Sequence, residues 1–392
     1  MQHPRIFGLD VLRTIAILLV LLAHTIPSVE KTNVITTISL FSAVIGVELF
    51  FVLSGFLIGV ILIKMHNQDI VTNFHSIRIF WIRRWFRTLP NYYLALFGFA
   101  VLFYLDTKEL IFSSSYGISF IVFLQNFFTF EFTNSFFGVS WSLAIEEWFY
   151  LLFPLFLFIS QFVFSNKKKS FLFVTFSFIL IPLIIKMFFA YSNYNIPWDA
   201  GYRKIVPIRL DAIGFGVLTA YIKYYYQNFF ERKRNIFLIV GLFLFSVLLI
   251  LFYNLEVLSY DFVNEKQLYD PGFFMKTFFF TLISLSISLL IPFLCNVKVK
   301  NSNSYFFKIV NIISLSSYSI YLTHLFYIFI FSYIYNKLNI SVDFFWLFLV
   351  WLSSIVGSYF QYNLFEVKFT KLRDNFGLKR DKITVKIDLV EK

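Results

Sequence analysis

Ten long apolar stretches alternate with short polar segments along the chain. A bilayer core of about 30 Å needs about 20 apolar residues per helix. The pattern predicts spans at 9–29, 39–63, 88–105, 140–164, 171–191, 208–226, 235–254, 273–295, 309–335 and 343–365. A further apolar piece at 117–130 is shorter, and we expect it to be re-entrant or interfacial. The sequence thus predicts an all-α polytopic membrane protein with about ten transmembrane helices.

The composition supports a membrane protein and limits the other classes. Of the 392 residues, 59% are hydrophobic and only 14% are charged, whereas a soluble domain is about one quarter charged. The single cysteine, Cys295, excludes a disulfide scaffold and a multi-cysteine metal site. We expect one membrane domain at 1–366 and a short basic cytosolic tail at 367–392.

The distribution of basic residues predicts the orientation. If the N-terminus is cytosolic, 25 of the 34 Lys and Arg residues fall in inner segments and six in outer ones. This bias predicts that both termini are cytosolic. Because the inner cations are spread over six segments, anionic lipid headgroups suffice as their partners, and no nucleic acid is indicated.

Charged side chains inside apolar spans are candidates for function, with structural salt bridges as the alternative, because burying them costs a few kcal/mol or more. Arg13 and His24 are eleven residues apart, which places them on one helix face within roughly 20° and about 16 Å apart. Glu48 lies near the outer end of the second span, at about the depth of His24. It could hold the imidazole in one tautomer, and an interfacial carboxylate is the alternative.

Three arginines come just before the third predicted span. Arg83, Arg84 and Arg87 have spacings that point them one way along a helix. Guanidinium groups in such a cluster suit phosphate through forked hydrogen bonds. The alternative is binding of lipid headgroups at the membrane surface.

Two adjacent carboxylates lie one turn inside the fourth span. Ser142, Glu146 and Tyr150 share one face at i, i+4 and i+8, whereas Glu147 is rotated by about 100°. We therefore expect Glu146 to face a cavity and Glu147 to face a neighbouring helix.

The sixth and ninth spans add further polar groups. Arg209 and Asp211 form an ion-pair candidate at the outer end of the sixth span. In the ninth, Ser317, Tyr321 and His324 share a face near mid-membrane. Hydrogen bonds between helices are the structural alternative for these hydroxyl groups.

Six motifs in this order resemble the acyltransferase-3 family of integral membrane acyltransferases, over essentially the whole chain. They are Leu9-Asp10 with Arg13 and His24, then GVELFFVLSGFLIG, RRWFRTLP, WSLAIEEWFYLLFP, RLDAIGFG and SSYSIYLTH. The chain departs from the family in having Glu48 where Asp is more usual, Trp148 for a frequent Gln, and no Pro after His324.

The resemblance implies acyl transfer, with acetyl favoured, from cytosolic acyl-CoA to a hydroxyl of a glycan or lipid-linked saccharide at the outer side of a bacterial cytoplasmic membrane. The Arg-x10-His pair falls on Arg13 and His24, and the Arg-x-x-Arg motif on Arg84 and Arg87. Acyl-CoA is a co-substrate here, and the resemblance implies no metal and no bound cofactor. The chain looks like a bare family domain without an appended hydrolase domain.

The residues fit this chemistry by their own arrangement, because acyl-CoA carries phosphates at one end of a long arm and a thioester at the other. Neutral His24 would take the proton of the acceptor hydroxyl, and a carboxylate would steady the imidazolium. Tyr318 or Ser317 would donate to the oxyanion. An acyl-histidine intermediate is the competing route.

The predicted site is thus a catalytic set and a substrate-binding set. The catalytic set is His24, Glu48, Glu146, Glu147, Tyr318 and His324. The substrate-binding set is Arg13, Arg83, Arg84, Arg87, Trp141, Arg209, Asp211 and Ser317.

A proton-coupled transporter or flippase is the main rival, because intramembrane His and Glu residues also build carriers. Inverted repeats with helices broken at matching positions would favour a carrier, and the sequence has neither. A purely structural membrane protein is the third alternative, and it leaves the cluster of His24, Glu48, Glu146 and Arg209 unexplained.

The orientation can be tested with reporters. We expect a reporter fused after Lys392 to read cytosolic and one inserted near Tyr260 to read extracytoplasmic, because the charge bias sets the number of crossings between them. Reporter activity in intact cells measures both positions. If both report the same side, a span has been miscounted.

Overall fold

Helices make up almost all of the described chain in the computed structural model. It describes residues 6–29, 33–68, 73–127, 136–192, 196–261, 266–267, 270–299 and 304–373. The long helices are α1 (Phe7–Val29), α2 (Asn33–Asn67), α3 (Phe74–Thr107), α5 (Ser140–Ser160), α6 (Lys167–Tyr191), α7 (Val206–Tyr225), α9 (Arg234–Ser259), α11 (Phe279–Leu294), α12 (Tyr305–Lys337) and α13 (Phe344–Gln361).

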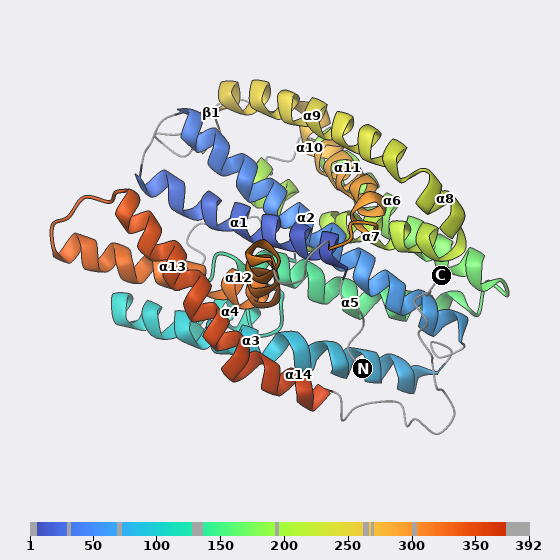
Figure 1. The fold of residues 1–392 in the computed structure, drawn as a ribbon, viewed down its shortest axis with the longest axis horizontal. Helices are drawn as coiled ribbons and strands as arrows, with labels where there is room; N and C mark the ends of the chain where they lie inside the picture. The colour runs from blue at the N-terminus through green and yellow to red at the C-terminus, as the bar shows by residue number, and fades with distance from the viewer. Residues whose placement is uncertain are drawn as a thin grey trace.

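Short elements connect the long helices. They are η1 (Ile111–Ser113), α4 (Ser115–Ser119), η2 (Trp198–Tyr202), α8 (Gln227–Arg232), α10 (Gly272–Thr277), η3 (Tyr362–Glu366) and α14 (Val367–Arg373). Two-residue strands β1 (Tyr260–Asp261) and β2 (Lys266–Gln267) pair antiparallel, with Tyr260 opposite Gln267. In Figure 1, α1, α2 and α5 run through the middle of the molecule, α9 and α11 lie on one side, and α3 and α13 lie on the other.

Nine of the ten predicted spans each correspond to one long helix, and the span 273–295 is divided between α10 and α11, which confirms an all-α polytopic membrane protein. Eight helices of the described chain are long and apolar enough to cross a membrane. The other two are α7, which carries Arg209, Asp211 and Lys223, and α11, which has only 16 residues. The charges of Arg209 and Asp211 have partners inside the protein, as described below.

Some predicted boundaries were wrong. α3 begins at Phe74 and not at 88, so the three arginines lie inside the helix. Asn73 caps its first turn by accepting from the backbone N–H of His75, and Pro90 does not end the helix. In the segment 117–130, the described residues form the end of the five-residue α4 and turns, which are too short to cross a bilayer. Of the predicted tail, residues 367–373 form α14 and the rest lies outside the described residues.

Two glycines let α2 and α7 approach to backbone contact. A Cβ on Gly55 would lie 2.0 Å from the carbonyl oxygen of Ile213, and one on Gly216 would lie 2.1 Å from that of Val52. Small residues allow such an approach between membrane helices. The close contact fixes the face of α2 that is turned to α7, and therefore also the opposite face, which lines the site.

We predict that Gly55→Ala lowers the free energy of unfolding by about 1–3 kcal/mol, because the added methyl group meets backbone that cannot yield. Thermal unfolding of the purified protein in detergent measures the change. Gly98→Ala is the matched control, since a Cβ at Gly98 meets nothing within 4 Å. Equal stability of the two variants would contradict the close packing.

Candidate active site

A cavity of about 140 Å³ lies between α1, α2, α3, α5 and α12. Its lining along α2 runs from Val47 to Ile61, which is about 21 Å of helix. Its polar lining consists of Arg13, Ser54, Arg84, Arg87, Thr88, Ser142, Glu146, Ser317, Tyr318 and Tyr321. The cavity is therefore elongated along the helices and brings together residues far apart in sequence.

Arg84 is held firmly at one side of this cavity. It donates a hydrogen bond of 2.6 Å to the hydroxyl of Tyr150, and its guanidinium carbon lies 4.0 Å from the centre of the same ring. The Tyr150 hydroxyl donates to Glu146 at 2.9 Å and is also hydrogen-bonded to Ser54. Glu146 lies 3.7 Å from Arg84. This arrangement fixes the arginine and lowers the local excess of positive charge.

Two further arginines enter the same cavity. Arg13 comes from α1 and lies 3.7 Å from Asp10, while Arg87 comes from α3. The negative charge of the Glu366 carboxylate attracts the guanidinium groups of both Arg13 and Arg87. The cavity thus collects three guanidinium groups, which suits an anionic ligand with several phosphate oxygens.

A pair of histidines lies beyond the other end of the cavity. His24 Nδ1 is 2.8 Å from the carbonyl oxygen of Val20, and His324 Nδ1 is 3.0 Å from that of Ile320. Because a carbonyl only accepts hydrogen bonds, each Nδ1 must carry the proton in a neutral ring. His324 Nε2 then has a lone pair and lies 3.3 Å from His24 Nδ1, so the single N–H of His24 is shared between this lone pair and the carbonyl oxygen of Val20.

This arrangement assigns the tautomer of His24. With its proton on Nδ1, the lone pair of His24 is on Nε2, the atom that can accept a proton. His24 is exposed, whereas His324 is fully buried. A proton gained by His24 would leave Nδ1–H donating to Val20 and His324, so the charged ring keeps its hydrogen bonds.

Tyr321 connects the cavity with the histidines. Its hydroxyl lies 2.5 Å from that of Ser142, and its ring centre is 6.1 Å from that of His324. Tyr318 and Ser317 also line the cavity, but their hydroxyls already donate to the carbonyls of Thr88 and Ser314. The hydroxyls of Tyr321 and Ser142 are also hydrogen-bonded, to each other and to the carbonyl oxygen of Val139 at 3.2 Å, so each of these four hydroxyls would have to change partner to donate to an oxyanion.

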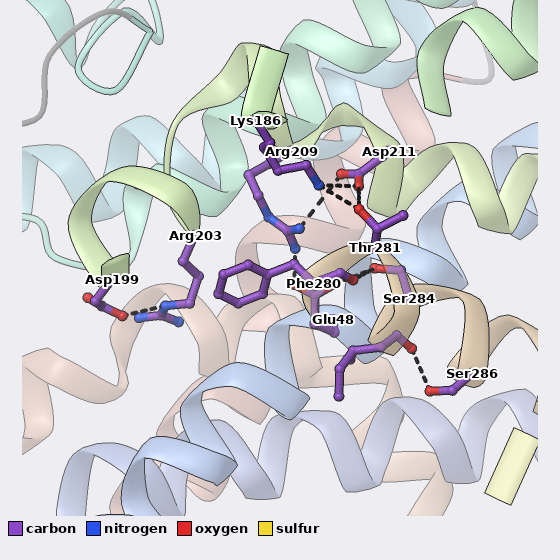
Figure 2. Close-up of polar contacts among 11 residues, drawn as sticks. Glu48, Lys186, Asp199, Arg203, Arg209, Asp211, Phe280, Thr281, Ser284 and Ser286 are labelled. Carbon is purple, nitrogen blue, oxygen red and sulfur yellow. Dashed lines mark hydrogen bonds and ion pairs between the residues drawn. The ribbon is translucent and has the colours of Figure 1, made fainter. Parts of the chain in front are cut away.

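Glu48 does not reach His24, so the predicted contact was wrong. Its carboxylate pairs with Arg209 and accepts a hydrogen bond of 2.6 Å from Ser284. Figure 2 shows these residues in one buried network, in which Arg209 is 3.7 Å from Asp211 and Lys186 is 2.6 Å from Asp211. The cause is helix rotation: Glu48 lies on the face of α2 turned to α7, and the cavity lies on the other face.

Arg209 and Asp211 therefore belong to this network and not to the cavity. Both side chains are 0% exposed, and the guanidinium of Arg209 also lies 4.6 Å from the ring centre of Phe280. The predicted ion pair between them is confirmed. A substrate cannot reach them in this arrangement, so their expected part in substrate binding is not supported.

The remaining predicted residues lie outside the cavity. Glu147 is buried and faces Thr88 and Trp85 of α3, as expected for a residue turned to a neighbouring helix. Arg83 donates to the backbone oxygen of Arg373. Trp141 lies under the guanidinium of Arg203, at 4.9 Å.

The predicted catalytic and binding sets leave out three groups that shape the site. Periodicity had placed two of them, Tyr150 and Tyr321, on polar helix faces without assigning them a role. Glu366 had no such signal, because it falls at the predicted end of the domain. It accepts hydrogen bonds from Asn91 and Ser319, which are 275 and 47 residues away in sequence.

Comparison with known proteins identifies the family to which the chain belongs. The family described as "Acyltransferase domain" matches residues 6–361. The chain belongs to this acyltransferase family. Membership supports an enzyme and gives no support to a carrier. No solved structure matches the chain.

Several bacterial relatives are similar to this chain. "Putative peptidoglycan O-acetyltransferase YrhL" of Bacillus subtilis is 36% identical over 43% of this chain and 26% of its own length. "Putative O-acetyltransferase SACOL0978" of Staphylococcus aureus is 27% identical over 81% of this chain and 50% of its own length. "Peptidoglycan O-acetyltransferase OatA" of Listeria monocytogenes is 32% identical over 38% of this chain and 24% of its own length. The chain thus spans half the length of these relatives or less.

The buried network gives a prediction about stability. We expect Glu48→Ala to destabilise the protein by about 3–5 kcal/mol, because Arg209 would stay buried without its hydrogen-bonded carboxylate and with only Asp211, at 3.7 Å, as a partner. The double variant Glu48→Leu with Arg209→Leu should lose less, since it removes both charges.

Thermal unfolding in detergent checks this prediction. Glu109→Ala serves as the control, because Glu109 is exposed after the end of α3. A Glu48→Ala variant as stable as the Glu109→Ala variant would show that the network does not hold the helices together.

Proposed function

We propose that this protein is an O-acyltransferase of a bacterial cytoplasmic membrane that moves an acetyl group from acetyl-CoA to a hydroxyl of an exported or lipid-linked saccharide. The observation that carries the proposal is the cavity with three arginines that continues through Tyr321 to a histidine pair. Family membership supports acyl transfer, and the names of the relatives support acetyl transfer to a glycan.

The cationic part of the cavity suits the donor. Arg13, Arg84 and Arg87 would hold the phosphates of acetyl-CoA, with Arg84 preset by Tyr150. The apolar lining of α2 between Val47 and Ile61 would accept the long arm. The thioester would then reach the end of the cavity near Tyr321 and His24.

The histidine end suits the transfer step. His24 Nε2 takes the proton of the acceptor hydroxyl as its oxygen attacks the thioester carbonyl carbon. The carbon–sulfur bond then breaks, and the thiolate of CoA takes the proton back from His24. His324 accepts a hydrogen bond from Nδ1 of His24 throughout and keeps Nε2 directed at the substrate.

The competing route forms an acyl-histidine first. His24 Nε2 would attack the thioester, CoA would leave, and the acceptor hydroxyl would then attack the acyl-imidazole. The tautomer that exposes Nε2 serves both routes. The two routes differ when no acceptor is present, because label from acetyl-CoA then becomes attached to the protein only in the acyl-histidine route.

The test uses the purified full chain in nanodiscs with labelled acetyl-CoA and the glycan and lipid fraction of a deletion strain. We expect His24→Gln to lower transfer by about 10²–10⁴-fold while acetyl-CoA still binds, because only the proton acceptor is removed. Arg84→Ala should instead weaken acetyl-CoA binding by about 10-fold or more. His75→Gln and Arg78→Ala are matched controls, because both residues are exposed on α3.

Transfer by His24→Gln at the wild-type rate would overturn the proposed function. Unchanged acetyl-CoA binding by Arg84→Ala would contradict donor binding by the arginines and favour the alternative, binding of lipid headgroups at the membrane surface. Label retained on His24 of the wild type in the absence of acceptor would select the acyl-histidine route.

A further inference from the structure

A second polar cluster lies near the histidine pair and is not used in the mechanism above. It is formed by Asp199 in the first turn of η2 and by Arg203 and Lys204, which follow η2. The carboxylate of Asp199 accepts a hydrogen bond of 2.5 Å from Nε of Arg203 and pairs with Lys204. Figure 2 shows Asp199 and Arg203 on one turn of chain, apart from the buried network of Glu48 and Arg209.

Several contacts fix this cluster in place. The guanidinium of Arg203 lies 4.9 Å from the ring centre of Trp141, at the start of α5. The side-chain amide of Asn126 donates to the backbone oxygens of Trp141 at 2.9 Å and of Lys204 at 2.6 Å. The side chain of Arg203 is only 9% exposed. The two cations are therefore held by the protein and do not simply extend into solvent.

The charges of the cluster do not cancel. Burial raises the pKa of Asp199, but the charges of Arg203 and Lys204 outweigh burial and hold this pKa below its ordinary value. Asp199 is therefore ionised, and two cations share one carboxylate. Of the five N–H donors of a guanidinium, only Nε of Arg203 has a partner among the described residues. The cluster therefore keeps a net positive charge, and the remaining N–H donors of Arg203 are available to a ligand.

A small cavity of about 40 Å³ lies beside the cluster. Of the three charged residues only Lys204 lines it, together with Ser140 and Trp141, against whose ring Arg203 packs. This volume exceeds the roughly 10–15 Å³ that one water molecule needs and falls well short of a sugar ring. A carboxylate or a single phosphate group is of suitable size.

The cluster adjoins the histidine end of the main cavity. Trp141 directly precedes Ser142, whose hydroxyl contacts that of Tyr321 at 2.5 Å. The positive charges of Arg203 and Lys204 also interact electrostatically with the imidazole of His24. The segment lies between α6 and α7, on the side of the membrane that the charge bias makes the outer one. Outer segments carry few cations, so lipid anchoring does not explain two adjacent ones here.

We propose that Arg203 and Lys204 form a subsite for an anionic group, a carboxylate or a phosphate, on the saccharide acceptor. This inference rests on the proposed function and names the class of its acceptor. The anion would take the free donors of Arg203 and the ammonium of Lys204, while Asp199 and Trp141 keep Arg203 oriented. Anchored there, the acceptor would present a hydroxyl to His24.

The test presents three forms of the natural acceptor to the full chain in nanodiscs with labelled acetyl-CoA. The first is the untreated glycan and lipid fraction of a deletion strain, the second has its carboxylates amidated, and the third has its phosphates removed by a phosphatase. We expect one treatment to lower wild-type transfer by about 10-fold or more, and the identity of that treatment tells carboxylate from phosphate.

Variants connect this loss to the cluster. Arg203→Gln should raise the KM for untreated acceptor by about 10-fold or more, because charge-assisted hydrogen bonds are lost, and leave the KM for acetyl-CoA unchanged. It should also make transfer insensitive to the effective treatment. Lys204→Gln should act in the same direction. Lys108→Gln is the matched control, since Lys108 is exposed in another outer segment.

The outcomes separate the two proposals. Equal wild-type transfer to all three forms, or an unchanged acceptor KM in Arg203→Gln, overturns the anionic subsite and leaves the acetyltransferase intact. A rise in the KM for acetyl-CoA instead would place Arg203 at the donor and also overturn it. No wild-type transfer to the untreated fraction removes both proposals. A melting temperature of Arg203→Gln near that of Lys108→Gln shows that folding is not the cause of a loss.

Discussion

The ion pair between Glu48 and Arg209 fixes the orientation of α2, on which the rest of the site depends. Charges buried at membrane depth are tolerated only with partners, and here two carboxylates and two cations join α2, α6, α7 and α11. The glycine contact between α2 and α7 lies on the same face of α2. With this face committed to the network, the opposite face is free to line the cavity.

The cavity itself differs in chemistry from one end to the other. Arginines gather at one part of it, and Glu146 and Tyr150 offset their mutual repulsion while fixing the geometry of Arg84. The imidazoles of His24 and His324 lie beyond the other end, and hydrogen bonds to backbone carbonyls hold the proton of each ring on Nδ1. No carboxylate is needed to orient His24, because a second histidine and a helix carbonyl do so. Such a division suits a donor that is anionic at one end and reactive at the other.

Helix α5 connects the proposed donor site with the proposed acceptor site. Glu146 faces the arginines, Ser142 contacts Tyr321, and Trp141 supports Arg203. These residues lie within two turns of one helix, so their relative positions are set by backbone geometry. The two substrates would therefore be brought together by one rigid element.

The sequence by itself determined the class of protein, the ten helices and most of the polar groups that matter. Apolar length sets helices in a membrane, because every backbone group must be satisfied within the segment. Periodicity within one helix likewise placed Glu146 and Glu147 on different faces. The resemblance to a family assigned Arg13, His24, Arg84 and Arg87 before any contact was known.

Only the tertiary structure decided which polar groups meet. Glu48 has about the same depth as His24, but depth does not define the rotation of one helix against another, and packing turned Glu48 to Arg209. The contact between His24 and His324 joins residues 300 apart, and Glu366 reaches Asn91 across 275. Such pairings depend on how side chains and glycines of neighbouring helices fit together, which periodicity within a single helix does not record.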